Sequence, residues 1–231
     1  MPLSFSAFLP PLLALNLLAA PQVPYIPQPA GPYCAAASVL MAGASTGLTL
    51  PLPELLRRVP VHRDGIAWLD LHQAVAPLGF ELLVAQAPRP VLDALLAAGV
   101  PVVLAVRTDP AAGKHAWVVT GRAGDIYTAL DPARPGALSL TPAALERAWL
   151  GGELLVVLRR DTPRPKGVDW ALLEKQSRRY QAVEWALRAA AVGRPDAHAL
   201  ALLDRAIAAD ASIPELHAAR ARVLRAMGAA P

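Results

Sequence analysis

The residues of this chain best suited to chemistry are its one cysteine and one of its histidines. Cys34 is the only cysteine among 231 residues, which excludes an intramolecular disulfide and a cysteine-rich zinc site. A thiol attacks as the thiolate, and both a helix N-terminus and a neighbouring imidazolium favour that form. Cys34 follows the proline-rich segment 21–32 and opens an alanine-rich, apolar run that ends at Gly43. We therefore expect Cys34 in the first turn of a helix, although a lone cysteine can also be a small buried hydrophobe.

Five histidines could supply the imidazole, and their positions separate them. His115 follows a turn-like run and opens the apolar strand pattern HAWVVTG, where a sheet would hold it at the mouth of a cleft. His72 lies in a helical pattern, and His62 lies in a loop beside charged residues. His198 and His217 lie in the helical last quarter, far from the cysteine in sequence. The sequence therefore predicts His115 as the base.

A carboxylate and an amide complete the predicted site. The strand pattern at 126–130 follows the His115 strand after a short turn and ends at Asp131. If the two strands pair as a hairpin, Asp131 lies near His115, where it would orient the ring and stabilise its protonated form. Gln28 lies six residues before Cys34. Its neutral amide would stabilise an oxyanion together with a backbone N–H at the helix start.

Three segments resemble the bacteriocin-processing (double-glycine) peptidase family and its secreted relatives. They are the lead VPYIPQ at 23–28, the small-residue helix that Cys34 opens, and the motif HAWVVTG followed by Asp131 and Pro132. The resemblance extends over roughly residues 22–158. It implies a papain-like fold, a peptide or protein substrate and, from the family alone, a preference for double glycine.

The resemblance also implies a role for each candidate residue. Cys34 would be the nucleophile, His115 the general base and acid, Asp131 its orienting residue and Gln28 the oxyanion donor. The family commonly has Gly-Pro directly after the cysteine, whereas Ala35 follows it here and is itself followed by alanine. A changed backbone at this point would weaken the oxyanion hole. A degenerate module that binds peptides or protein partners without cutting them is therefore the alternative to a cysteine peptidase.

The remaining patterns predict an α+β domain over residues 22–160. Helical patterns cover about 33–43, 49–59, 68–77, 90–98 and 141–149, and strand patterns cover 80–85, 100–106, 115–121, 126–130 and 154–158. Helices first and then mostly consecutive strands predict N-terminal helices packed on an antiparallel sheet.

A charged, proline-rich linker at 161–168 separates this domain from a helical region at 169–231. Its three helical segments, about 169–192, 196–210 and 213–227, have apolar residues at helical spacing and resemble tetratricopeptide units. Little more than one repeat is present, and isolated repeats are marginally stable. The region could bind a protein partner, which would make it the working part of the chain, or it could cap an apolar face of the main domain.

The first 21 residues predict where the protein acts. The apolar run 3–20 ends in small residues and resembles a secretory signal, and no lysine or arginine occurs before Arg57. We expect an exported protein, periplasmic or secreted. An uncleaved membrane anchor and an apolar arm packed on the domain are the alternatives.

Charge and motifs exclude several other function classes. The net charge is +4, and the basic residues form only short clusters rather than a stripe with interleaved aromatics, which is against nucleic-acid binding. The sequence has no glycine-rich phosphate loop and no histidine–carboxylate cluster at metal-ligand spacing. The sequence therefore predicts neither a cofactor nor a metal.

Overall fold

The computed structural model describes residues 22–63, 65–107, 113–191 and 197–228. The signal-like run lies outside these ranges, so export stays a prediction. Within the same ranges, no helix combines the length and the hydropathy that crossing a bilayer requires.

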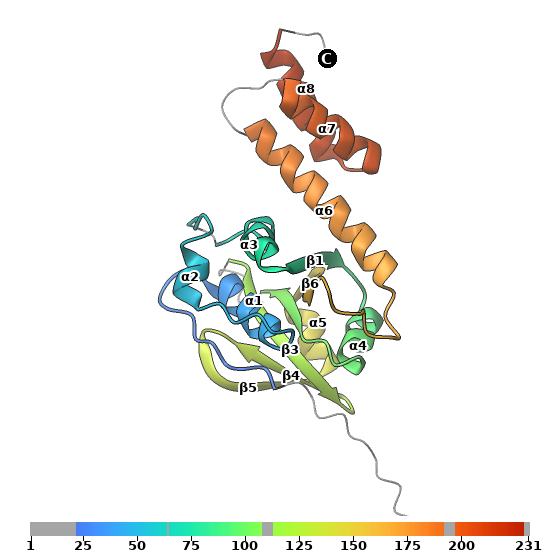
Figure 1. Cartoon of the computed structure of the whole chain (residues 1–231). Helices are drawn as coiled ribbons and strands as arrows, with labels where there is room; N and C mark the ends of the chain where they lie inside the picture. The colour runs from blue at the N-terminus through green and yellow to red at the C-terminus, as the bar shows by residue number, and fades with distance from the viewer. Residues whose placement is uncertain (1–21, 64, 108–112, 192–196, 229–231) are drawn as a thin grey trace, which may run out of the picture.

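A six-stranded antiparallel sheet forms the centre of the domain (Figure 1). Its strand order is β1-β6-β2-β3-β4-β5, and every neighbouring pair is antiparallel. The strands are β1 (Phe80–Gln86), β2 (Val102–Val106), β3 (His115–Ala123), β4 (Ile126–Asp131), β5 (Arg134–Leu140) and β6 (Trp149–Arg159). Every residue of β2 is buried, as its continuous apolar pattern predicts for a strand covered on both faces.

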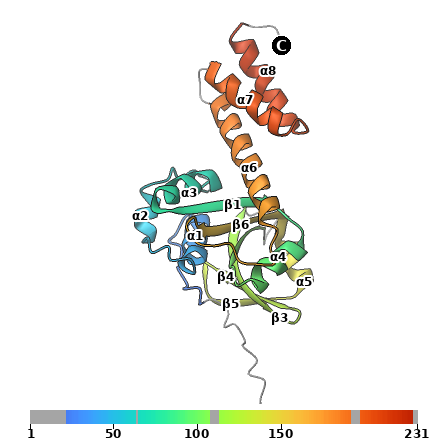
Figure 2. The same ribbon diagram turned by 45° about the vertical axis from the view of Figure 1, so that its right-hand side comes forward.

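Helices cover both faces of this sheet (Figures 1 and 2). The helices of the domain are α1 (Cys34–Ala44), α2 (Leu52–Leu56), α3 (Trp68–Val75), α4 (Arg89–Ala97) and α5 (Pro142–Ala148), with the short 3-10 helix η1 (Ala76–Leu78) after α3. Apolar side chains of α1, α2 and α3 share one core with one face of the sheet, and those of α4 and α5 share a second core with the other face. The predicted α+β architecture is confirmed.

Three elements differ from the sequence patterns. The patterns do not predict β5, because Pro135 and Gly136 interrupt it; β5 is an edge strand, where a missing N–H breaks no ladder bond. The helix expected at 49–59 is limited to α2. It begins only after Pro51, whose backbone is extended, and it ends before Arg57. β6 begins five residues before the expected 154, since Gly151 and its neighbour adopt positive φ inside it and weaken the strand pattern.

The last quarter of the chain forms three helices, α6 (Trp170–Ala191), α7 (Ala197–Ala209) and α8 (Pro214–Ala226), close to the predicted ranges. α7 and α8 pack on the C-terminal half of α6, and Ala186, Leu203 and Leu216 are buried at their common contact. The resemblance to tetratricopeptide repeats stays a prediction.

The N-terminal half of α6 packs on the main domain instead. Leu173 is buried in the core that α4 and α5 share with the sheet. The Ser177 hydroxyl accepts a hydrogen bond from the Val84 N–H (3.2 Å) and donates one to the Leu82 carbonyl (3.4 Å), which caps the open edge of β1. α6 therefore links the two parts across the expected linker.

A partly buried ion pair from the C-terminal half of α6 adds to this attachment. Asp70 of α3 is only 5% exposed, and both of its oxygens bind the Arg188 guanidinium of α6, with Oδ2 and Nη2 3.0 Å apart. Arg188→Met leaves that carboxylate buried without its cation, so we expect a loss of about 1–3 kcal/mol in the free energy of unfolding, measured in urea. Arg220→Met breaks an exposed pair with Asp204 and should cost at most about 1 kcal/mol. Equal losses in the two variants would contradict the structural role of Arg188.

Candidate active site

Cys34 is the first residue of α1 and is half-buried. The preceding residue, Tyr33, makes no side-chain capping bond, so no capping side chain occupies the first N–H groups of the helix. These groups and the helix dipole favour negative charge at this end of the helix. The structure thus confirms the predicted placement of Cys34 in the first turn.

A buried hydrogen bond fixes this helix relative to the His115 strand. The Ser38 hydroxyl of α1 donates to the carbonyl of Ala116, the residue after His115, at 3.3 Å. Sequence reasoning missed Ser38. A lone hydroxyl one turn after the cysteine, in a helix that is otherwise apolar and buried, is the signal that could have found it.

His115 and Asp131 meet at the ends of paired strands, as the hairpin predicts. β3 and β4 are antiparallel with Val118 opposite Leu130, which puts the end of β4 beside the start of β3. Nε2 of His115 lies 2.7 Å from Oδ1 of Asp131. Cys34 lines the same cavity as His115 and lies close enough to the ring to raise its pKa. Because Asp131 binds Nε2, Nδ1 is the ring nitrogen that remains for a proton transfer.

The Asp131 carboxylate is buried, and protein groups take the place of water around it. It is 1% exposed, and its Oδ1 also accepts the Ala133 N–H at 2.9 Å, while Arg134 lies 3.3 Å from Oδ2. Burial alone would raise the pKa of Asp131, but the hydrogen bonds from His115 and Ala133 outweigh burial and hold this pKa below its usual value.

The pKa of the His115 ring shifts in the opposite direction. Burial alone would lower the pKa of His115, but hydrogen bonds to Cys34 and Asp131, with the charges of those groups, raise it above its usual value of 6.5. The two shifts favour an imidazolium held between a sulfur and a carboxylate. That arrangement can activate a thiol and then protonate a leaving group.

Solved structures of two peptidase domains have a fold similar to that of this chain. The peptidase domain of Streptococcus ComA, a bifunctional ABC transporter, is 19% identical with a TM-score of 0.50, over 58% of this chain and 94% of that domain. A protein from Bacillus anthracis described as C39-like peptidase is 17% identical with a TM-score of 0.50, over 63% and 96%. This chain has a papain-like C39 peptidase fold.

A third structure, a double-glycine motif protease from an AMS/PCAT transporter in complex with a leader peptide, is 22% identical with a TM-score of 0.49, over 60% and 91%. The fold assignment rests on the first two structures. No protein family and no curated protein matches the sequence of this chain.

Gln28 is attached to the papain-like domain beside the Asp131 turn. Its N–H donates to the Pro132 carbonyl at 2.9 Å, and the Tyr25 hydroxyl donates to the same oxygen at 3.3 Å. The Gln28 amide nitrogen donates to the Gly31 carbonyl at 3.3 Å, and its Oε1 is buried without a partner among the described residues. The side chain does not line the cavity at Cys34, so its role as oxyanion donor stays a prediction.

A cavity of about 380 Å³ opens at Cys34 and His115 in the papain-like domain. The loop that ends at Trp68 forms one wall, and Glu153 of β6 binds both the Trp68 indole and, at 3.3 Å, the Lys114 ammonium. Further wall residues come from the C-terminal helix α6.

Those residues are Tyr180 and Glu184, which sequence reasoning missed. Burial raises the pKa of Glu184, and the nearby Glu153 carboxylate adds to this, while Arg188 opposes it. No motif marks either residue, and both lie beyond the expected linker. Only the docking of α6 brings them to the cavity.

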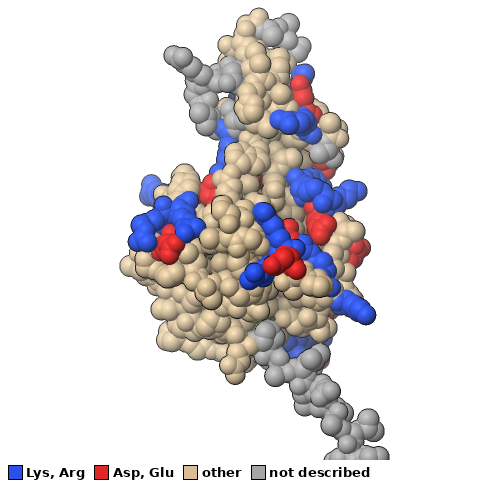
Figure 3. Space-filling model, viewed as in Figure 1, with Lys and Arg blue, Asp and Glu red and all other residues tan. Residues whose placement is uncertain are grey.

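In the part of the chain that the structure describes, no three histidine, cysteine, aspartate or glutamate side chains are arranged to hold a metal ion. On the face shown in Figure 3, basic and acidic side chains are interspersed rather than segregated.

Proposed function

We propose that this chain is a cysteine peptidase that hydrolyses peptide bonds through Cys34. The observation that carries the proposal is that Cys34 and His115 line one open cavity, with the His115 ring bound to the buried Asp131 carboxylate. The papain-like fold supports it, and the resemblance to double-glycine peptidases suggests small residues before the scissile bond.

In this proposal the Cys34 thiolate attacks the scissile carbonyl, and a C–S bond forms. The peptide C–N bond then breaks as His115 gives its proton to the leaving amine, which leaves an S-acyl enzyme. Neutral His115 next accepts a proton from water, and the resulting hydroxide equivalent attacks the thioester. This releases the acid and restores the Cys34 thiolate beside protonated His115. The Cys34 N–H and Gln28 would stabilise the oxyanion in both steps.

A peptide-like ligand that carries a thiol-reactive group tests this proposal before any substrate is known. We expect it to label Cys34 at near-neutral pH and to label His115→Ala much more slowly, since the ring stabilises the thiolate. Equal labelling of the two proteins would count against the proposed site.

A second candidate is a peptidase-like module that binds peptides without cutting them. Two observations favour it: the alanines that follow Cys34, and a Gln28 amide that binds Gly31 rather than facing the cavity. Peptide binding without turnover, unchanged by Cys34→Ala, would support this candidate.

We also propose that the protein is exported, because of the apolar run at 3–20. If that run is a cleaved signal, the protein recovered from outside the cytoplasm should begin near Pro21. Recovery of the protein only in the cytoplasm, with residue 1 or 2 at its N-terminus, would contradict export.

The raised pKa of His115 gives the proposed activity a specific pH dependence. The imidazolium persists above pH 6.5 and is lost as the pH rises through the raised pKa, so hydrolysis should decline on the alkaline side. Asp131→Asn removes a hydrogen-bonded charge that raises this pKa and leaves the burial that lowers it. We expect the alkaline limb of kcat/KM against pH to move to lower pH, with kcat/KM reduced about 100-fold or more.

Arg134→Ala is the matched control for that measurement. Arg134 is 64% exposed and approaches only the other oxygen of Asp131, at 3.3 Å. We expect its removal to change kcat/KM less than about threefold. An alkaline limb that Asp131→Asn leaves in place would contradict the orienting role of Asp131.

A further inference from the structure

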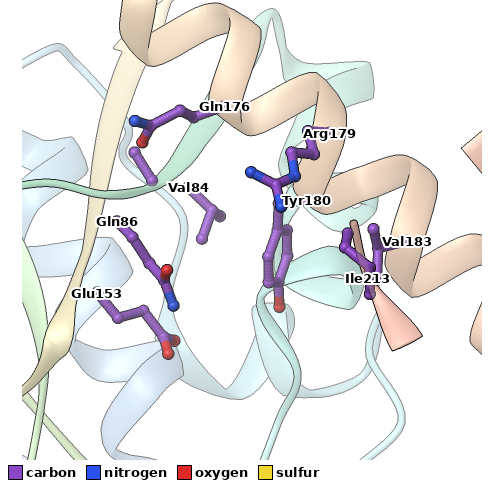
Figure 4. Close-up of a pocket in the computed structure, with 9 residues that line it drawn as sticks. Val84, Gln86, Glu153, Gln176, Arg179, Tyr180, Val183 and Ile213 are labelled. Carbon is purple, nitrogen blue, oxygen red and sulfur yellow. The ribbon is translucent and has the colours of Figure 1, made fainter. Parts of the chain in front are cut away.

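A second cavity, of about 300 Å³, adjoins the one at Cys34 (Figure 4). Glu153 and Tyr180 line both cavities, so the two share a wall. One side of the second cavity is the end of β1, and the other side is α6. Ile213, just before α8, lies at its outer end.

The end of β1 offers unused backbone groups to this cavity. β1 is an edge strand, and its alternate residues direct their N–H and C=O away from β6. The backbone N–H and C=O of Leu82 are hydrogen-bonded to the side chains of His72 and Ser177. The N–H of Val84 is hydrogen-bonded to the Ser177 hydroxyl. The Val84 carbonyl points the same way as its N–H and accepts from none of the described residues. The backbone of Gln86 continues the same open edge.

The opposite wall of the cavity, formed by α6, has a second hydrogen-bond acceptor that no donor of the described residues reaches. Oε1 of Gln176, on α6, is buried and has no partner among the residues that the structure describes. Figure 4 shows Gln176 and Arg179 on α6 across the cavity from Val84 and Gln86. A buried carbonyl oxygen without a donor is unfavourable, so a bound group with N–H donors would be stabilised between these walls.

We propose that this cavity binds an extended segment of the substrate peptide, which adds to the end of β1 through main-chain hydrogen bonds. A peptide in extended form carries N–H donors for Val84 and Gln176 and a carbonyl for the Gln86 N–H. The shared wall at Glu153 and Tyr180 connects this segment to a scissile bond at Cys34. Ser177 blocks the edge further along, so the bound segment is short. The inference rests on the proposed function, since it names a further binding site for the same substrate.

Substrate length tests the inference. Degenerate internally quenched peptides of about ten residues should have kcat/KM about tenfold or more above that of peptides of about four residues, because remote contacts lower the barrier. Val183→Trp fills the cavity from α6 and should remove this advantage without changing hydrolysis of the short peptides. Arg178→Trp adds the same side chain on the exposed side of α6 and should preserve it.

Gln176→Ala keeps the test valid if Val183→Trp does not fold, because it removes one acceptor without filling space. It should reduce the advantage of the long peptides and leave the short ones unaffected. Equal kcat/KM for both lengths, or a length advantage that neither variant changes, would overturn the inference.

A binding measurement separates this inference from the proposed function. The Cys34→Ala protein is mixed with the degenerate ten-residue peptides, and hydrogen exchange at the Gln86 amide is followed. Slower exchange that Val183→Trp abolishes supports the site even if the wild-type protein cleaves nothing. Unchanged exchange at Gln86, with normal turnover by the wild-type protein, overturns the site and leaves the peptidase proposal standing.

Discussion

Cys34→Ala is expected to abolish peptide hydrolysis, and His115→Ala to lower kcat by about 10²–10⁴-fold. The first variant removes the atom that forms the S-acyl bond. The second removes the proton donor for the leaving amine and the cation that stabilises the thiolate. Initial rates with internally quenched peptides, measured on proteins with matched melting temperatures, give both effects.

His198→Ala is the matched control for these rates. His198 is exposed on α7 and far in sequence from Cys34. Its loss should leave kcat within about twofold, since surface substitutions away from a site have small effects. A His198 variant as impaired as the His115 variant would indicate a general effect of losing a histidine, and the proposed base would lose its support.

Ending the chain at residue 168 is expected to destabilise the papain-like domain by at least about 3 kcal/mol, or roughly 6–12 °C in melting temperature. This truncation exposes the core around Leu173 and the edge of β1 that Ser177 caps. It also removes the ion pair between Arg188 and Asp70. Thermal and urea unfolding of the truncated and full chains measure the loss.

Ending the chain at residue 191 is the contrasting truncation. It removes α7 and α8 but keeps α6, with the contacts from Leu173 to Arg188. The domain should then melt within a few degrees of the full chain. In that case α6 acts as a cap on the domain, and α7 and α8 form a separate unit. If the chain that ends at 168 is as stable as the full chain, α6 is not a structural part of the domain.

The positions of Cys34, His115 and Asp131 could be predicted because they depend on local signals. A helix start after prolines positions Cys34, and a strand start and the end of its hairpin partner position His115 and Asp131. Each signal is read within about ten residues, and one hairpin brings the two strand residues together. The α+β class follows from the same periodicities.

The walls of the site could not be predicted in the same way. Tyr180 and Glu184 reach the cavity only because α6 returns to the sheet edge, a contact between segments about 100 residues apart or more, such as Arg188 with Asp70. The position of Gln28 could not be predicted either. Its position next to Pro132 depends on backbone bonds that no spacing in the sequence reveals.

The most direct test of the proposed mechanism is the intact mass of the protein during turnover of a peptide ester or thioester. A covalent acyl adduct on Cys34 should accumulate and decay, because acylation of such an activated substrate is faster than hydrolysis of the S-acyl bond. Proteolytic mapping should place the adduct on the peptide that contains Cys34, and Cys34→Ala should show none. Hydrolysis of the same substrate by Cys34→Ala at the wild-type rate, or an adduct on another residue, would contradict the account.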